Sequence, residues 1–190
     1  MPSAKKKTNS KKGTPQVEGP NNDSHIPRSM VFRRGKVGHS IIELVANMRN
    51  VMNPYTALRL QENKKNTLKD FLSIAPALNV SHFLIFSQTS LNTNLRLIRI
   101  PHGPTFTFRV LNYSLMADIV NMQRKPHSPG HEYRFPPLVV LNNFTQAIHG
   151  TSGDSMKLLA TMFQNMFPPI DISNIQLDEC RRVVLFNYDA

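Results

Sequence analysis

Few residues of this sequence have the types and spacing that catalysis or metal binding requires. His127 and His131 lie four positions apart, but the Ser-Pro-Gly between them predicts a loop, and no third residue of the metal-ligating type accompanies them. Cys180 is the single cysteine, and the neighbouring Arg181 and Arg182 favour a thiolate, yet no positioned base can be identified to make it a nucleophile. We therefore predict no enzyme activity, no catalytic residues, no metal site and no cofactor.

The residues best suited to chemistry are basic side chains, whose charge fits phosphate groups. The chain has 23 lysines and arginines against 12 acidic residues, a formal net charge of +11 and a pI near 10.2. Such a balance predicts attraction to a polyanion, either nucleic acid or an acidic membrane surface. The candidate RNA-binding residues are Lys5, Lys6, Lys7, Lys11, Lys12, Arg33, Arg34, Lys36, Arg59, Lys64, Lys65, Lys69, Thr105, Thr107 and Arg109.

Each of these groups also has a plainer interpretation as a solvated surface. The lysines of AKKKTNSKK, residues 4–12, are compatible with a nuclear localisation signal, with an RNA-binding arm or with a flexible tail. The turn GKVGHS, residues 35–40, lacks the spacing of a nucleotide-binding loop, which leaves a single phosphate contact or an ordinary turn. In PTFTFRV, residues 104–110, a polar face of Thr105, Thr107 and Arg109 alternates with an apolar face. That polar face either contacts RNA or protein, or forms internal hydrogen bonds.

The elements that would position these groups follow from hydrophobic periodicity. Residues 1–28 contain almost no large apolar side chains and predict a disordered basic arm. A short strand at 29–35 leads into a helix that ends before Pro54, for which Ser40 and Glu43 predict a capping box. A second helix is expected from Thr67 to about residue 77, with Asp70 as its capping partner. Three strands at 81–88, 94–100 and 104–110 then predict a mostly antiparallel sheet.

From residue 114 the pattern starts again. Helices are expected at 114–123 and 155–167, and strands at 136–144 and 181–189, so the order of elements resembles that of the first part. We predict an α/β domain over residues 29–190, built from an N-terminal half at 29–112 and a partial C-terminal half at 113–190. No apolar run approaches the roughly 18 residues that a membrane span needs, and we expect no membrane partner.

Several blocks of the sequence together resemble one protein family. NKKNTLKDFL, SHFLIFSQT, GPTFTFRV, PPLVVLNNF, KLLATMFQNMFP and RRVVLFNYD occur in this order. In order and spacing they resemble the Peter Pan / Ssf branch of the Brix-domain proteins over about residues 29–189. The resemblance implies a Brix domain of two similar α/β half-domains, each like the anticodon-binding domain of class IIa aminoacyl-tRNA synthetases. It also implies that the second half-domain is incomplete at the C-terminus.

The resemblance further implies a function. Such a protein is expected to bind precursor rRNA and to scaffold assembly of the large (60S) ribosomal subunit in the nucleus and nucleolus, without catalysis. Its expected partners are the precursor rRNA, a dedicated smaller assembly-factor protein and other preribosomal proteins. The alternative is a protein-interaction module of a nuclear complex that contacts RNA only non-specifically, through its basic arm.

Overall fold

The computed structural model describes residues 26–62, 66–127, 130–144, 153–170 and 180–189 of the chain. The predicted disordered arm lies outside these ranges up to residue 25, and its predicted end at residue 28 is wrong, because Arg28 is already the first residue of a strand. In the described part of the chain, no helix has the length and apolar character needed to cross a bilayer.

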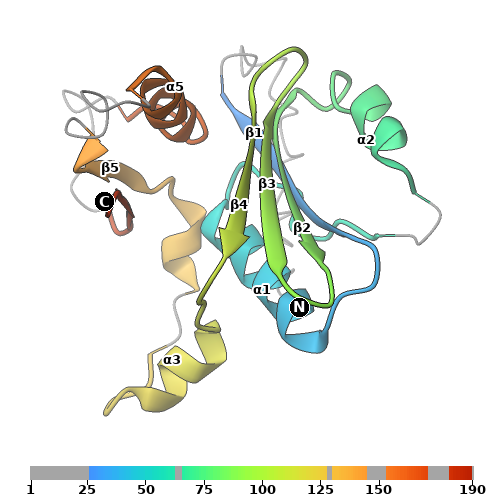
Figure 1. Cartoon of the computed structure of the whole chain (residues 1–190). Helices are drawn as coiled ribbons and strands as arrows, with labels where there is room; N and C mark the ends of the chain where they lie inside the picture. Colours follow the sequence, from blue (N-terminus) through green and yellow to red (C-terminus); the bar gives the residue numbers. More distant parts are fainter. Residues whose placement is uncertain (1–25, 63–65, 128–129, 145–152, 171–179, 190) are drawn as a thin grey trace, which may run out of the picture.

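The first structural unit is a four-stranded sheet (Figure 1). Its strands are β1 (Arg28–Arg34), β2 (Val80–Gln88), β3 (Thr93–Arg99) and β4 (Thr105–Val110), in that spatial order. β1 pairs with β2 in parallel, whereas β2, β3 and β4 pair antiparallel. The prediction of three consecutive strands in a mostly antiparallel sheet is therefore confirmed.

Two helices belong to this unit. α1 (His39–Val51) connects the parallel strands, but Gly38 is its N-cap residue and no side chain caps it, so the predicted Ser40–Glu43 capping box is wrong. α2 (Leu68–Ile74) has the capping box predicted for it, because an Asp70 carboxylate oxygen accepts the Thr67 backbone N–H at 2.7 Å. α2 ends at Ile74, earlier than residue 77, because Pro76 has no N–H to donate to the carbonyl of the preceding turn, although Ala75 keeps helical backbone angles.

The second unit repeats the strand–helix–strand pattern. It contains α3 (Met116–Met122), the 3-10 helix η2 (His131–Arg134), β5 (Leu138–Asn142), α5 (Gly153–Gln164) and β6 (Val183–Asn187). β5 and β6 form a parallel two-stranded sheet, as β1 and β2 do around α1. The fold class is thus mixed α/β, as expected, while the boundary between halves at residues 112 and 113 stays a prediction.

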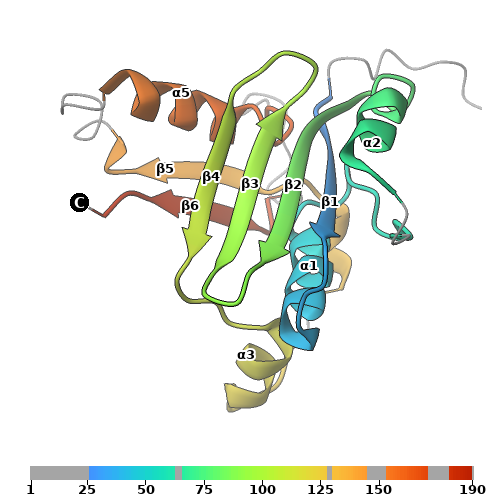
Figure 2. The ribbon, with the colours of Figure 1, turned by 45° about the vertical axis from the view of Figure 1, so that its right-hand side comes forward.

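The two sheets share one hydrophobic core. The inner face of the first sheet contributes Val31, Leu84 and Leu97, which cluster with Met162 and Phe167 from α5 and the segment after it. Val184 and Phe186 of β6 pack against the same cluster, and Figure 2 shows the first sheet crossing in front of β5 and β6. An apolar cavity of about 250 Å³ lies between the sheets. The second unit, together with Ile41 and Val45 of α1, therefore covers the inner face of the first sheet.

The outer face of the first sheet is covered only in part. Met30, Phe32 and Phe83 of β1 and β2 form a second cluster, against which Leu68 and Phe71 pack. The Phe32 and Phe71 rings stack with their centroids 4.4 Å apart. On β3 and β4 the outward side chains of Arg96, Thr105, Thr107 and Arg109 are exposed. Among the described residues, none buries the polar side chains on this half of the face.

Candidate nucleic-acid interface

The strands of the first sheet contain positively charged residues and no acidic ones. They contain six arginines, three in β1, two in β3 and one in β4, and no aspartate or glutamate. Side chains that follow one another along a strand point to opposite faces, so strand position divides these arginines between the inner and the outer face. Which arginines are available to a ligand is decided by that division.

Polar side chains align across the outer face at one end of the sheet. The strand register places Arg34, Ser87, Asn94 and Arg109 in one row across all four strands, and Arg96 beside Thr107 in the next row. The arginines and Thr107 of these rows are exposed, as is Thr105 one row further along β4, and Ser87 and Asn94 are partly buried. We call this surface the outer basic face. Its residues are Arg34, Ser87, Asn94, Arg96, Thr105, Thr107 and Arg109.

The alternation predicted for β4 is confirmed. Thr105, Thr107 and Arg109 are exposed, whereas Phe106 and Phe108 are partly buried against the inner core. The two threonine hydroxyls have no hydrogen-bond partner in the described part of the chain, and Arg109 Nε donates to Asn92 Oδ1 at 2.8 Å. The polar face of β4 is thus accessible, and its guanidinium is oriented by a neutral side chain that leaves the charge uncompensated.

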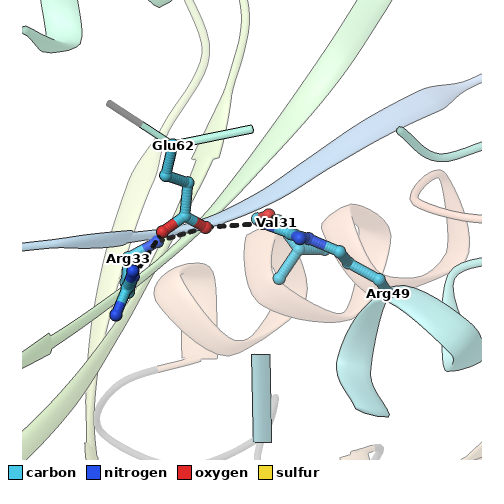
Figure 3. Close-up of polar contacts among 4 residues, drawn as sticks. All are labelled: Val31, Arg33, Arg49 and Glu62. Carbon is cyan, nitrogen blue, oxygen red and sulfur yellow. Dashed lines mark hydrogen bonds and ion pairs between the residues drawn. The ribbon is translucent and has the colours of Figure 1, made fainter. Parts of the chain in front are cut away.

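Arg33 and Arg34 point to opposite faces of the sheet, although they are neighbours at the end of β1. Arg33 Nε lies 2.6 Å from Glu62 Oε2, and the Arg33 backbone N–H also donates to Glu62 (Figure 3). Arg49 Nη2 bonds the other oxygen of Glu62 at 2.5 Å, and its Nε donates to the Val31 carbonyl at 2.9 Å. Glu62 therefore compensates charge on two arginines and ties β1 to α1. RNA binding by Arg33 stays a prediction.

The other predicted residues fall in several places. Lys36 is exposed on the loop between β1 and α1, and the Gly38 N–H fixes that loop to β2 by donating to Gln88 Oε1 at 2.7 Å. Arg59, before α2, and Lys69, in its first turn, are exposed. Seven predicted residues lie outside the described part of the chain: Lys5, Lys6, Lys7, Lys11, Lys12, Lys64 and Lys65.

Arg96 lies near the middle of the outer basic face and was not among the residues predicted from the sequence. Its guanidinium is exposed and makes no hydrogen bond or ion pair with any described residue. The signal was present in NLRLIRI, where Arg96 stands between two leucines on the opposite face of an alternating strand. The histidines considered as metal ligands do not form a metal site. His127 lies 3.4 Å from Glu132, and the described residues contain no cluster of three metal-ligating side chains.

Comparison with known proteins places this geometry in a family. The family model for the Brix domain matches residues 35–190. The chain belongs to the Brix family. That match includes both sheets apart from β1, so it contains every residue of the outer basic face except Arg34.

Several curated relatives match this Brix domain over most of the chain. The Peter Pan-like protein of Arabidopsis thaliana is 44% identical over 165 residues, which cover 86% of this chain and 46% of that protein. The Suppressor of SWI4 1 homolog of Homo sapiens is 45% identical, over 86% of this chain and 33% of that protein. The Ribosome biogenesis protein SSF1 of Saccharomyces cerevisiae is 38% identical, over 96% of this chain and 43% of that protein. The chain thus spans between a third and about half of the length of these relatives.

Proposed function

We propose that this chain acts in ribosome biogenesis as a non-catalytic factor that binds precursor rRNA of the large (60S) ribosomal subunit. The observation that carries the proposal is the outer basic face, where Arg34, Arg96 and Arg109 stand on strands without a single carboxylate. Relatives named ribosome biogenesis proteins supply the assembly context. A protein that holds RNA in place needs cationic contacts and no reacting groups.

The binding mechanism is electrostatic and positional. Guanidinium groups on the outer basic face replace counterions along the RNA backbone. Each phosphate neutralised in this way contributes about −0.7 to −0.9 to the salt slope, the slope of the logarithm of the binding constant against the logarithm of the salt concentration. The hydroxyls of Thr105 and Thr107 donate to phosphate or sugar oxygens between these charges. Because the second unit covers the inner face, RNA on the outer face leaves the shared core undisturbed. A scaffold of this kind blocks premature RNA contacts until it is released.

The proposal includes a cellular setting. We propose a nuclear and nucleolar location, with the lysines of residues 4–12 as the address, and assembly with a dedicated smaller partner and other preribosomal proteins. The support is the family membership together with the names of the relatives. In this setting the arm and the outer basic face both contribute to RNA affinity, and the face decides the position.

Ultraviolet crosslinking of the tagged full chain in cells tests the proposal. We expect crosslinks at a few discrete positions of large-subunit precursor rRNA, with attached peptides from β1, β3 and β4. A triple variant, Arg34→Gln with Arg96→Gln and Arg109→Gln, should lose those positions. A variant with the five arm lysines, Lys5, Lys6, Lys7, Lys11 and Lys12, changed to Gln should keep them at lower yield. Diffuse crosslinks carried by the arm alone would overturn the proposal.

One observation favours a second candidate function, that of a protein-interaction module whose RNA contact is non-specific. The outer side of the β5/β6 sheet exposes four apolar side chains, among them Val183 at 61% and Leu185 at 59% exposure. If this is the main function, Val183→Thr with Leu185→Thr removes co-purifying proteins from the tagged chain, and the triple arginine variant leaves them bound. The two functions therefore make different predictions. Loss of bound proteins in the Val183→Thr, Leu185→Thr variant supports the protein-interaction module, and loss of discrete RNA crosslinks in the triple arginine variant supports the RNA-binding factor.

A further inference from the structure

We infer that the outer basic face holds double-helical RNA by its backbone, with Arg96 as a central contact, rather than single-stranded RNA by its bases. This inference rests on the proposed function, because it names the class of RNA that the same face would take. It depends on what the face lacks as well as on what it presents. Three features of the described residues carry it.

The first feature is the absence of a stacking platform. Proteins that read single-stranded RNA place aromatic rings on an open sheet face, where unpaired bases stack on them. None of the seven residues of the outer basic face is aromatic. The phenylalanines of β4 point inward: the Phe108 ring stacks on Phe163 of α5 at a centroid distance of 6.2 Å, and Phe106 packs on the core. Bases lying on this face would meet threonine, asparagine and arginine instead of rings.

The second feature is the order of donors across the face. In the terminal row the cationic residues Arg34 and Arg109 stand at the two edges, with Ser87 and Asn94 between them. Adjacent strands lie about 4.8 Å apart, so the two arginine positions are separated by roughly 14 Å. Charges at the edges with neutral donors between them suit a surface on which phosphates flank a row of hydroxyls. The minor groove of A-form RNA is such a surface, wide and shallow with 2′-hydroxyls along it.

The third feature is the difference between arginines that the fold uses and arginines that it leaves free. Arg33 and Arg49 bind Glu62, and Arg182 binds main-chain carbonyl oxygens. The guanidinium groups of Arg34 and Arg96 form neither a hydrogen bond nor an ion pair within the described residues, and both side chains are exposed. Exposed guanidinium groups without an ion-pair partner can contact phosphate without first breaking an internal salt bridge, and the strand fixes the positions of their Cα atoms.

The experiment compares three labelled nucleic acids with the full chain by fluorescence anisotropy in about 0.1 M salt. They are an RNA duplex of about 20 base pairs, one strand of that duplex alone, and the DNA duplex of the same sequence. The RNA duplex is longer than the roughly 16 base pairs that a double-stranded-RNA-binding domain spans. Arg96→Gln and Thr107→Val are the test variants. Arg134→Gln is the matched control, because Arg134 is exposed in η2, outside the outer basic face.

We expect the RNA duplex to bind several-fold more tightly than the single strand and the DNA duplex. Arg96→Gln should weaken duplex binding roughly threefold to tenfold and reduce the salt slope by about 1, whereas Arg134→Gln should do neither. Thr107→Val should narrow the preference for RNA over DNA, since it removes a hydroxyl that reaches the 2′-OH. Tighter binding of the single strand, or equal effects of Arg96→Gln and Arg134→Gln, would overturn the inference and leave RNA binding standing. Absence of salt-dependent binding to either RNA would overturn the proposed function itself.

Discussion

The guanidinium of Arg182 donates a hydrogen bond to the carbonyl oxygen of Val51 at 3.1 Å and so joins the start of β6 to the end of α1. The same side chain donates to the carbonyl oxygens of Asn53 at 2.6 Å and Phe135 at 3.2 Å, and it lies over the Tyr133 ring at 5.0 Å. The last carbonyl groups of a helix have no partner within the helix, and a cation satisfies both their hydrogen bonding and the helix dipole. Arg182 therefore couples the two units of the domain.

Arg182→Met should lower the free energy of unfolding by about 3 kcal/mol, since hydrogen bonds from a charged donor contribute about 1.5–3 kcal/mol. Urea denaturation followed by circular dichroism measures the change. Arg124→Met is the control, because Arg124 is exposed and has no polar partner among the described residues. A similar loss of stability in both variants would show that Arg182 does not couple the units.

Glu62→Gln should destabilise the domain by about 3 kcal/mol, because it leaves the charges of Arg33 and Arg49 uncompensated. The Glu62 and Arg49 side chains are only 14% and 13% exposed, so water replaces the lost carboxylate poorly. Glu43→Gln removes an exposed carboxylate 3.4 Å from His39 and should cost less than about 0.5 kcal/mol. Urea midpoints of the two variants give the comparison, and equal midpoints would contradict a structural role for Glu62.

Stability should fall as the pH drops from about 6.5 towards 4, on account of His82. Burial, with a smaller contribution from the positive charge of Arg99, lowers the pKa of His82 from 6.5 to about 4. The unfolded chain therefore takes up the proton first, so this part of the stability is complete above pH 6.5 and is lost as the pH approaches the folded pKa. The loss reaches about 3 kcal/mol, at 1.36 kcal/mol per pKa unit.

The measurement for His82 is the urea midpoint at several pH values for the native chain and for His82→Gln. We expect the variant to lack the pH dependence between 6.5 and 4 that the native chain has. Titration of the His82 imidazole by NMR in the native chain gives an independent value that does not depend on the folding of the variant. An imidazole that titrates near 6.5 in the folded protein would refute the prediction.

Gly103→Ala should destabilise the β3–β4 hairpin, and with it the outer basic face, by about 2 kcal/mol. A Cβ on Gly103 would lie 2.3 Å from the Cβ of Arg99 and 3.0 Å from its carbonyl oxygen. The Gly103 N–H donates to that same oxygen at 3.1 Å, so the turn cannot open without losing the bond. Gly130→Ala is the control, because nothing lies within 4 Å of a Cβ there. Thermal unfolding of both variants tests the difference, and equal midpoints would count against close packing at this turn.

Much of the fold was predictable because strands and helices are encoded by the spacing of neighbours along the chain. The alternation in TFTFRV assigned Thr105, Thr107 and Arg109 to an open face, and the pair Thr67 and Asp70 gave the start of α2. The capping prediction was wrong at Ser40, because α1 begins at His39 with Gly38 as its N-cap residue, and no side chain caps it. Local patterns fix local structure, and they are ambiguous where two nearby residues can serve the same role.

The sequence by itself determined the excess of basic charge, the family resemblance and the two-faced strands that give the outer basic face its chemistry. Only the tertiary structure decided which arginines remain free. Arg33 meets Glu62 from 29 positions away, and Arg182 meets Val51 from 131 positions away, whereas Arg34 and Arg96 meet no carboxylate among the described residues. The physical reason is that a charge is neutralised by whatever the folded chain brings within a few ångströms, and that distance is set by packing of the whole domain.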